Sequence, residues 1–175
     1  MSHSIRSLDP QGDLAAVAEL YGAAGDYWAL ANRRAHGAAE VAAFFTDGPP
    51  GCEPAQSYRL GIFEGADLVG VAELSFGFPM PGDAYLGLMV LAASHKGRGV
   101  GKGLLRHIEG LARQRGASRI YLGVLEENPR GLAFWQGQGF ADTGVRRRDE
   151  ETGHLMLRLG KDLGPQEASR SGHLS

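Results

Sequence analysis

A glycine-rich segment between an apolar stretch and an amphipathic stretch is the feature that most constrains this chain. Residues 94–104 read Ser-His-Lys-Gly-Arg-Gly-Val-Gly-Lys-Gly-Leu, so that Gly97, Gly99, Gly101 and Gly103 alternate with Lys96, Arg98, Val100 and Lys102. Residues 84–91, just before it, are largely apolar on both faces, which predicts a central strand of a sheet. The apolar spacing over residues 100–115 predicts an amphipathic helix that ends at Gly116. The sequence therefore predicts a strand, a glycine loop and a helix in direct succession.

This glycine loop has the composition of an anion site. The first N–H groups of a helix have no partner within the helix and carry the positive end of its dipole. Glycines let the backbone approach an anion closely, and the three interleaved cations add charge. A flexible turn that only leads into the helix is the alternative, but one or two glycines suffice for that. The dinucleotide fingerprint and the P-loop need glycines an odd number of positions apart, whereas all separations here are even. We therefore expect backbone amides to hold a diphosphate.

The remaining periodicities predict a mixed α/β domain. Further strands are predicted over residues 58–63, 68–76, 119–125, 140–145 and 154–159, and further helices over 9–24, 37–46 and 129–136. The charged run 146–151 is predicted to be a solvated loop. Residues 161–175 are polar and are predicted to form a loose C-terminal tail, which leaves 1–160 as a single domain. The predicted sheet has six or seven strands.

Composition excludes several function classes. The formal net charge of −2 lacks the basic footprint of a nucleic-acid-binding protein. Cys52 is the single cysteine, which excludes an internal disulfide and a cysteine-rich zinc site, and no metal-binding motif occurs. No apolar run reaches the roughly 18 residues of a membrane span, and the N-terminus lacks the apolar stretch of a signal peptide. We expect a cytoplasmic protein that binds no nucleic acid, membrane or metal.

Two motifs resemble those of the GNAT N-acetyltransferase superfamily. Residues 96–101, Lys-Gly-Arg-Gly-Val-Gly, resemble the family's pyrophosphate loop, [RQ]-x-x-G-x-[GA]. Residues 128–140, Asn-Pro-Arg-Gly-Leu-Ala-Phe-Trp-Gln-Gly-Gln-Gly-Phe, resemble N-x-x-A-x-x-[FY]-Y-x-x-x-G-F. The resemblance spans about residues 58–159. It implies a mixed, mostly antiparallel sheet flanked by about four helices, with a splay between two central strands.

The resemblance also implies a reaction and a set of donor-binding residues. The reaction is direct transfer of an acetyl group from acetyl-CoA to a primary amine of a small molecule or protein, in a ternary complex. A homodimer would fit the family. The residues implied to hold acetyl-CoA are Lys96, Gly97, Arg98, Gly99, Val100, Gly101 and Lys102 at the pyrophosphate, the backbone of Met89, Val90 and Leu91 along the pantetheine and thioester, and Asn128, Phe134 and Trp135 beside the pantetheine arm.

Two positions depart from the family pattern. Lys96 replaces Arg or Gln but still supplies a cation. Trp135 stands where many members have a tyrosine that protonates the departing CoA thiolate, and an indole N–H is not a useful acid. The group that protonates the thiolate is therefore unassigned. The departure at Trp135 motivates an alternative function, that of a non-catalytic acyl-CoA sensor. A third possible function is that of a protein that binds a different nucleotide at the same helix terminus.

Glu73 is the candidate general base. It lies in the middle of the predicted strand 68–76, next to the strand implied to bind the cofactor. The alternatives for Glu73 are a solvent-facing position on the strand and a structural ion pair. The role of base also requires that its carboxylate reach the proton that it removes. Tyr85 and His95 are secondary candidates, with His95 expected beside the phosphates. The acceptor is not identified; residues 22–54 are expected to shape its pocket, and their acids would suit a cationic amine.

Overall fold

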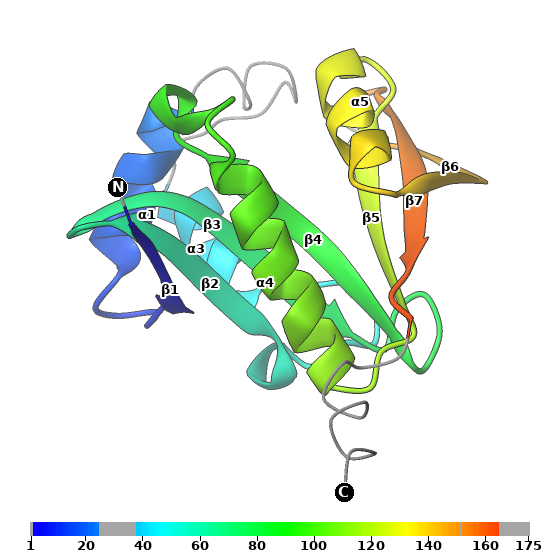
Figure 1. The fold of residues 1–175 in the computed structure, drawn as a ribbon, viewed down its shortest axis with the longest axis horizontal. Coiled ribbons are helices and arrows are strands. Elements are labelled where there is room, and N and C mark those ends of the chain that lie inside the picture. The colour runs from blue at the N-terminus through cyan, green and yellow to red at the C-terminus, as the bar shows by residue number, and fades with distance from the viewer. Residues whose placement is uncertain (1, 25–37, 151, 165–175) are drawn as a thin grey trace, which may run out of the picture.

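The computed structural model describes residues 2–24, 38–150 and 152–164, which form a seven-stranded sheet with helices on both faces (Figure 1). In chain order the elements are β1 (His3–Ser7), α1 (Leu14–Ala23), α3 (Ala38–Thr46), β2 (Tyr58–Glu64), β3 (Asp67–Phe76), β4 (Asp83–Leu91), α4 (Val100–Gln114), β5 (Arg119–Leu125), α5 (Pro129–Gly137), β6 (Ala141–Arg148) and β7 (Leu155–Asp162). Short 3-10 turns occupy Pro54–Gln56 and Ala93–His95.

The sheet has the order β1-β2-β3-β4-β5-β7-β6, with β4 in the centre. All neighbouring strands are antiparallel except β4 and β5, which are parallel and are connected through α4. The expectation of a mixed, mostly antiparallel sheet of six to seven strands is confirmed. The apolar character of β4 on both faces matches its central place, because each face of this strand is covered by helices.

Two cores fill the space between the sheet and its helices. On one face, α4 buries an apolar stripe against the sheet, and Leu104, Leu105 and Ile108 are at most 2% exposed. On the other face, α1 and α3 bury Val17, Leu20 and Phe44. Figure 1 shows α4 in front of the strands and α1 and α3 behind them. Each fully buried Leu or Ile contributes roughly 1.5–3 kcal/mol relative to an exposed one.

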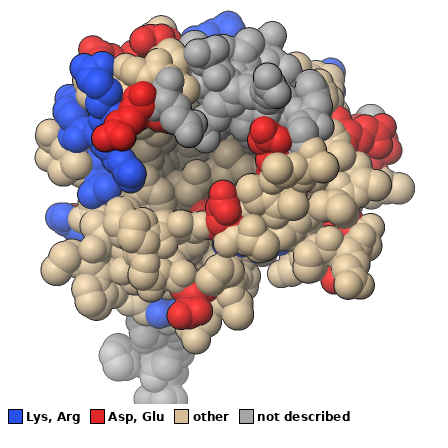
Figure 2. Space-filling model, turned by 180° about the vertical axis from the view of Figure 1, so that it is seen from behind, with Lys and Arg blue, Asp and Glu red and all other residues tan. Residues whose placement is uncertain are grey.

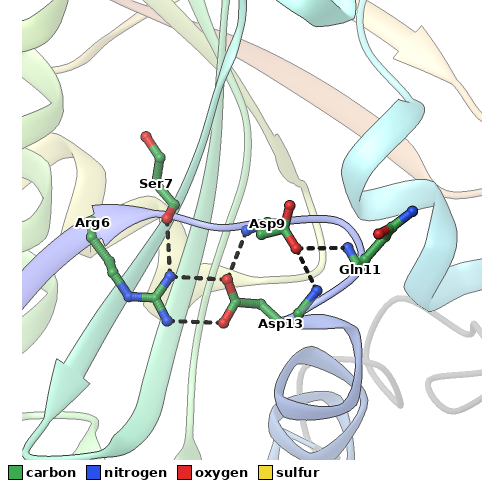
Figure 3. Close-up of polar contacts among 6 residues, drawn as sticks. Arg6, Ser7, Asp9, Gln11 and Asp13 are labelled. Carbon is green, nitrogen blue, oxygen red and sulfur yellow. Dashed lines mark hydrogen bonds and ion pairs between the residues drawn. The ribbon is translucent and has the colours of Figure 1, made fainter.

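A compact set of polar contacts links β1 to α1 (Figure 3). The Asp13 carboxylate accepts hydrogen bonds from the Arg6 guanidinium at 2.9 Å and from the Asp9 amide at 2.7 Å. The Asp9 carboxylate in turn accepts from the amides of Gln11 and Gly12. The turn 9–13 is thereby closed by side chains, so α1 begins at Leu14 and not at Asp9, where a helix is predicted from the sequence.

Three further differences from the sequence analysis follow from tertiary contacts. Strand β1 is not predicted, because its residues are polar and mostly exposed. Arg146–Arg148 belong to β6 and not to a loop, because they pair with β7. Strand β7 continues through Asp162 and Leu163 is 4% exposed, so the domain extends past residue 160. Lys161, expected to begin the tail, donates to both carboxylate oxygens of Glu109 on α4.

Other expectations fall outside the described ranges or concern membranes. Residues 25–37 of the segment 22–54, which is expected to shape the acceptor pocket, and most of the expected tail lie outside the described residues. None of the helices in the described ranges combines the length and the apolar character needed to cross a bilayer.

Candidate functional site

The two central strands separate part-way along their length. Strands β4 and β5 pair only from Asp83 to Leu86 and from Arg119 to Leu122, although β4 continues to Leu91 and β5 to Leu125. A pocket occupies the gap, and it is lined by Leu86, Gly87, Leu88, Met89, Leu122, Gly123, Val124, Leu125, Asn128, Trp135 and Met156. The splay implied by the family resemblance is therefore present, and it forms a cleft.

A bulge at Gly87 marks the start of this gap. In the β3–β4 pair, Glu73 faces Leu88 and Leu74 faces Leu86, so Gly87 is an extra residue on β4. Its N–H donates to Oε2 of Glu73 at 3.1 Å. A Cβ atom at position 87 would overlap the Glu73 carboxylate, so any larger residue there requires the Glu73 side chain to move. The sequence analysis does not single out Gly87; its signal is one glycine inside an apolar strand, which often marks a bulge.

The β4 residues after the bulge offer backbone groups to the pocket. Met89, Val90 and Leu91 pair with β3 on one side, but the opposite edge of the strand faces no strand. The side chains of Met89 and Leu91 pack against the α4 core, and Val90 is buried on the other face. Of the three residues expected to contact a pantetheine arm, Met89 therefore lines the pocket, and Val90 and Leu91 continue the same strand edge beyond it.

The glycine loop folds into the start of α4 through two residues in the left-handed region. Gly97 has φ +78° and Gly99 has φ +80°, and Gly99 is the N-cap of α4. No side chain caps this helix and its first turn contains no acid. The first amides of α4 therefore remain available to an anion. Lys96, Arg98 and Lys102 are exposed around them.

The other two glycines of the loop differ in their surroundings. Gly101 is buried, and a Cβ there would lie 3.3 Å from Leu91 and 3.5 Å from Phe134. The helix start, the end of β4 and α5 therefore meet at Gly101. A Cβ at Gly103 would meet nothing within 4 Å, and no packing contact explains this glycine.

Helix α5 closes the other side of the pocket. Asn128 is its N-cap, and its Oδ1 accepts from the Gly131 amide at 2.9 Å. Trp135 lines the pocket and lies edge-to-face against Phe134 and Phe140, at 4.9 and 5.5 Å between ring centroids. Asn128 and Trp135 both reach the pocket, and Phe134 stands between them and the glycine loop.

Glu73 lies beside the bulge, on the sheet face covered by α1 and α3. It is 4% exposed, which excludes the solvent-facing alternative. Oε1 accepts from Ser75 Oγ at 2.7 Å and lies 3.5 Å from Nη2 of Arg59, whose Nη1 donates to the Phe44 carbonyl. Burial raises the pKa of Glu73, while the hydrogen bond from Ser75 and the charge of Arg59 oppose that rise. Glu73 is thus both ion-paired and adjacent to the pocket through Gly87.

The secondary candidates separate in the structure. Nε2 of His95 lies 2.8 Å from Oε2 of Glu64 on β2, so its ring is held by β2. The Tyr85 hydroxyl, by contrast, lies 3.3 Å from where a Cβ of Gly123 would stand, at the pocket. Burial raises the pKa of the Cys52 thiol, which disfavours the reactive thiolate. Within the described ranges, no cluster of three or more His, Cys, Asp or Glu residues is arranged to hold a metal ion.

Comparison with known proteins gives consistent matches. The family model described as "Acetyltransferase (GNAT) family" matches residues 18–140. Over 93 residues the chain is 32% identical to N-alpha-acetyltransferase RimI of Mycobacterium tuberculosis, covering 53% of this chain and 57% of that protein. Over 55 residues it is 36% identical to streptothricin acetyltransferase of Streptomyces lavendulae, covering 31% of this chain and 29% of that protein. The chain thus spans less than two thirds of the length of these curated relatives.

The fold also matches solved structures over nearly its whole length. An acetyltransferase from Thermus thermophilus superposes with a TM-score of 0.73 at 23% sequence identity, covering 93% of this chain and 97% of that one. At this identity the likeness concerns the fold.

Proposed function

Because the chain belongs to the acetyltransferase (GNAT) family, we propose that it transfers an acetyl group from acetyl-CoA to a primary amine. One observation carries the proposal. An uncapped helix N-terminus behind a glycine loop stands at the end of the strand that forms one wall of an open cleft. This arrangement suits a long donor with a diphosphate at one point and a reactive end further along. When bound, acetyl-CoA supplies the activated acetyl group.

The residues around the loop fit the diphosphate end of this donor. The amides from Gly97 to Lys102 would bind the phosphate oxygens at the helix N-terminus. Gly97 and Gly99 permit this loop, because both have a backbone conformation that L side chains rarely adopt. Lys96, Arg98 and Lys102 would add positive charge at the rim. The unpaired edge of Met89–Leu91 and the side of α5 with Asn128 and Trp135 would hold the pantetheine arm.

The bulge supplies the groups for the reacting end. Backbone N–H groups on the free edge of β4 next to Gly87 would polarise the thioester carbonyl, and one such donor is worth roughly 3–4 kcal/mol in the transition state. Glu73 would accept the proton of the attacking amine, directly or through one water. Its raised pKa brings the carboxylate closer to the working pH of a general base.

Trp135 differs in role from the tyrosine common at its position. Its indole can donate a hydrogen bond but cannot release a proton to the leaving thiolate. We therefore place Trp135 in the packing of the pantetheine arm, together with Phe134.

Gly101→Glu tests the assignment of the donor site. The substitution puts bulk and negative charge against Leu91 and Phe134 at the start of α4. We expect acetyl-CoA affinity, measured by isothermal titration calorimetry, to fall at least about 100-fold because the helix terminus no longer favours an anion. Gly110→Glu is the matched control, because it adds the same charge to the same helix in open space.

Two results would contradict the proposal. Unchanged affinity in a folded Gly101→Glu variant would remove the glycine loop from donor binding. Tight acetyl-CoA binding without CoA release on a broad panel of amines would instead indicate a non-catalytic sensor.

A further inference from the structure

A basic and aromatic cluster on the α1/α3 face of the sheet has no role in the donor site. We call it the Tyr85 cluster; it consists of Phe78, Tyr85, Arg147 and Arg158. The Phe78 and Tyr85 rings lie edge-to-face with centroids 5.1 Å apart, and the Arg158 guanidinium lies 5.0 Å from the Phe78 centroid. Figure 2 looks onto this face, and blue side chains gather there on the side of β6 and β7 and border a central hollow.

Strand register brings this cluster to the pocket. Arg158 on β7 pairs with Gly123 on β5, and cross-strand partners share a face. Gly123 lines the pocket and has no side chain, which leaves room for the Tyr85 hydroxyl, 3.3 Å from the position a Cβ would take. Arg147 on β6 pairs with Met156, another pocket residue. The cluster therefore lies along the β5–β7 side of the cleft.

The two arginines of the cluster lack carboxylate partners among the described residues. Arg119 and Arg146 each form an ion pair with an aspartate, at 2.6 and 2.7 Å, whereas neither Arg147 nor Arg158 forms one with any described acid. Arg158 is half-buried, so its charge is only partly solvated. Arg158 is the cross-strand partner of the pocket residue Gly123. A half-buried guanidinium without a counter-ion at such a position is suited to bind an anion, and its planar fork matches a carboxylate.

The opposite side of the same face is acidic. Tyr85 pairs with Ser75 across β3 and β4, and Glu73 is two residues from Ser75 on the same face. Asp47 lies close enough to Glu73 to act on its charge, and Arg59 offsets one of these two negative charges. The face thus carries a negative end at Glu73 and a positive end at Arg158, with Tyr85 between them.

We propose that the acceptor amine also carries a carboxylate, which Arg158 binds while the amine points to Glu73. The acceptor class is then small amino acids. Glu73 and Arg158 lie on either side of Tyr85. The amine that meets Glu73 and the carboxylate that meets Arg158 therefore belong to one short molecule. This inference rests on the proposed acetyl transfer and names its substrate class.

The test compares matched acceptors. Initial rates are measured for a set of free L-amino acids and for their carboxamides, which keep the amine and lose the negative charge. We expect kcat/KM to favour the free acids about ten- to a hundredfold, the scale of a hydrogen bond to a charged group. Arg158→Gln should abolish this preference by raising KM for the acids and leaving the carboxamides unchanged, and Arg158→Lys should retain part of it. Arg146→Gln, whose partner is Asp142, is the control and should keep the full preference.

A binding measurement separates this inference from the proposed function. N-acetyl-L-amino acids are titrated into wild-type protein and Arg158→Gln, followed by NMR. Binding that depends on Arg158 supports the anion site even if no amine is acetylated, and in that case only the transfer activity fails. Equal rates on acids and carboxamides, or binding that Arg158→Gln does not weaken, overturn the inference while acetyl transfer stands.

Discussion

Glu73 shows how one residue can serve both the fold and the chemistry. Its carboxylate closes a buried network with Arg59 and Ser75, and Arg59 extends that network to the end of α3 through the Phe44 carbonyl. The same carboxylate accepts from the Gly87 amide at the bulge. A purely structural ion pair needs no contact with the pocket, whereas Glu73 reaches it through Gly87.

At the residue scale we predict the effect of Glu73→Gln. Turnover should fall about 10²–10⁴-fold, because the amide cannot accept the amine proton. Since burial raises the pKa of Glu73, the wild-type rate should decline on the acid side at a pH above the ordinary carboxylate range, and this decline should vanish in the variant. Steady-state pH profiles of kcat/KM measure both effects.

The control for this variant is Glu19→Gln, an exposed carboxylate on α1. Acetyl-CoA affinity should be unchanged in both variants, which shows that the pocket remains folded. An acid limb that persists in Glu73→Gln would assign the base to another group.

At the element scale, α4 and its loop owe their form to local chemistry. Gly97 and Gly99 permit the turn, the apolar stripe fixes the buried face, and Gly116, with φ +81°, follows the helix end. The turn before α1 depends instead on side chains: Asp13 accepts from Arg6 on β1 and from the Asp9 amide. These hydrogen bonds lower the pKa of Asp13 to about 2, and the bond from Arg6 has the larger effect.

This lowered pKa predicts an acid-dependent stability. A carboxyl whose pKa is lower in the folded chain stabilises the fold fully above its unfolded pKa of 3.8, and that contribution is lost as pH falls toward about 2. Asp13→Asn should therefore lower Tm at pH 7 and show a shallower loss of Tm between pH 4 and 2. Asp162→Asn, which breaks the exposed pair with Arg119, is the control and should shift Tm little at either pH. Equal acid sensitivity in Asp13→Asn and wild type would contradict the prediction.

At the scale of the whole molecule, the cleft exists because the sheet is joined only at one end. Strands β1–β4 and β5–β7 share the short β4–β5 pairing, and residues of both groups pack into the core beneath α4. Figure 1 shows that β5, β7 and α5 separate from β4 at the end of the sheet where the glycine loop lies. The core holds the two groups together while the other end stays open.

Leu163 belongs to this shared core, just after β7. Its amide donates to the Ser118 carbonyl and its side chain is 4% exposed. We predict that Leu163→Ala lowers the free energy of unfolding by about 2–5 kcal/mol, because it leaves a cavity. Leu14→Ala is the control: Leu14 is 39% exposed, and its replacement should change stability by about 0.5 kcal/mol or less. Chemical denaturation measures both, and equal effects would place Leu163 outside the core.

The sequence by itself determined the elements whose signals are local. The glycine loop, α4, β5 and α5 lie where the sequence predicts them, because glycine conformation and apolar periodicity act over a few neighbouring residues. Polar strands such as β1 carry no such signal, since their place depends on a partner strand.

Only the tertiary structure decided which distant residues meet. The Glu73 carboxylate, from another strand, occupies the space that a side chain at Gly87 would take. The Tyr85 hydroxyl interacts with Arg158 next to Gly123, which has no side chain to crowd it. Likewise, Arg158 lacks a carboxylate among the described residues that surround it. These facts arise from strand register and packing, which join segments far apart in the chain, so no local pattern encodes them.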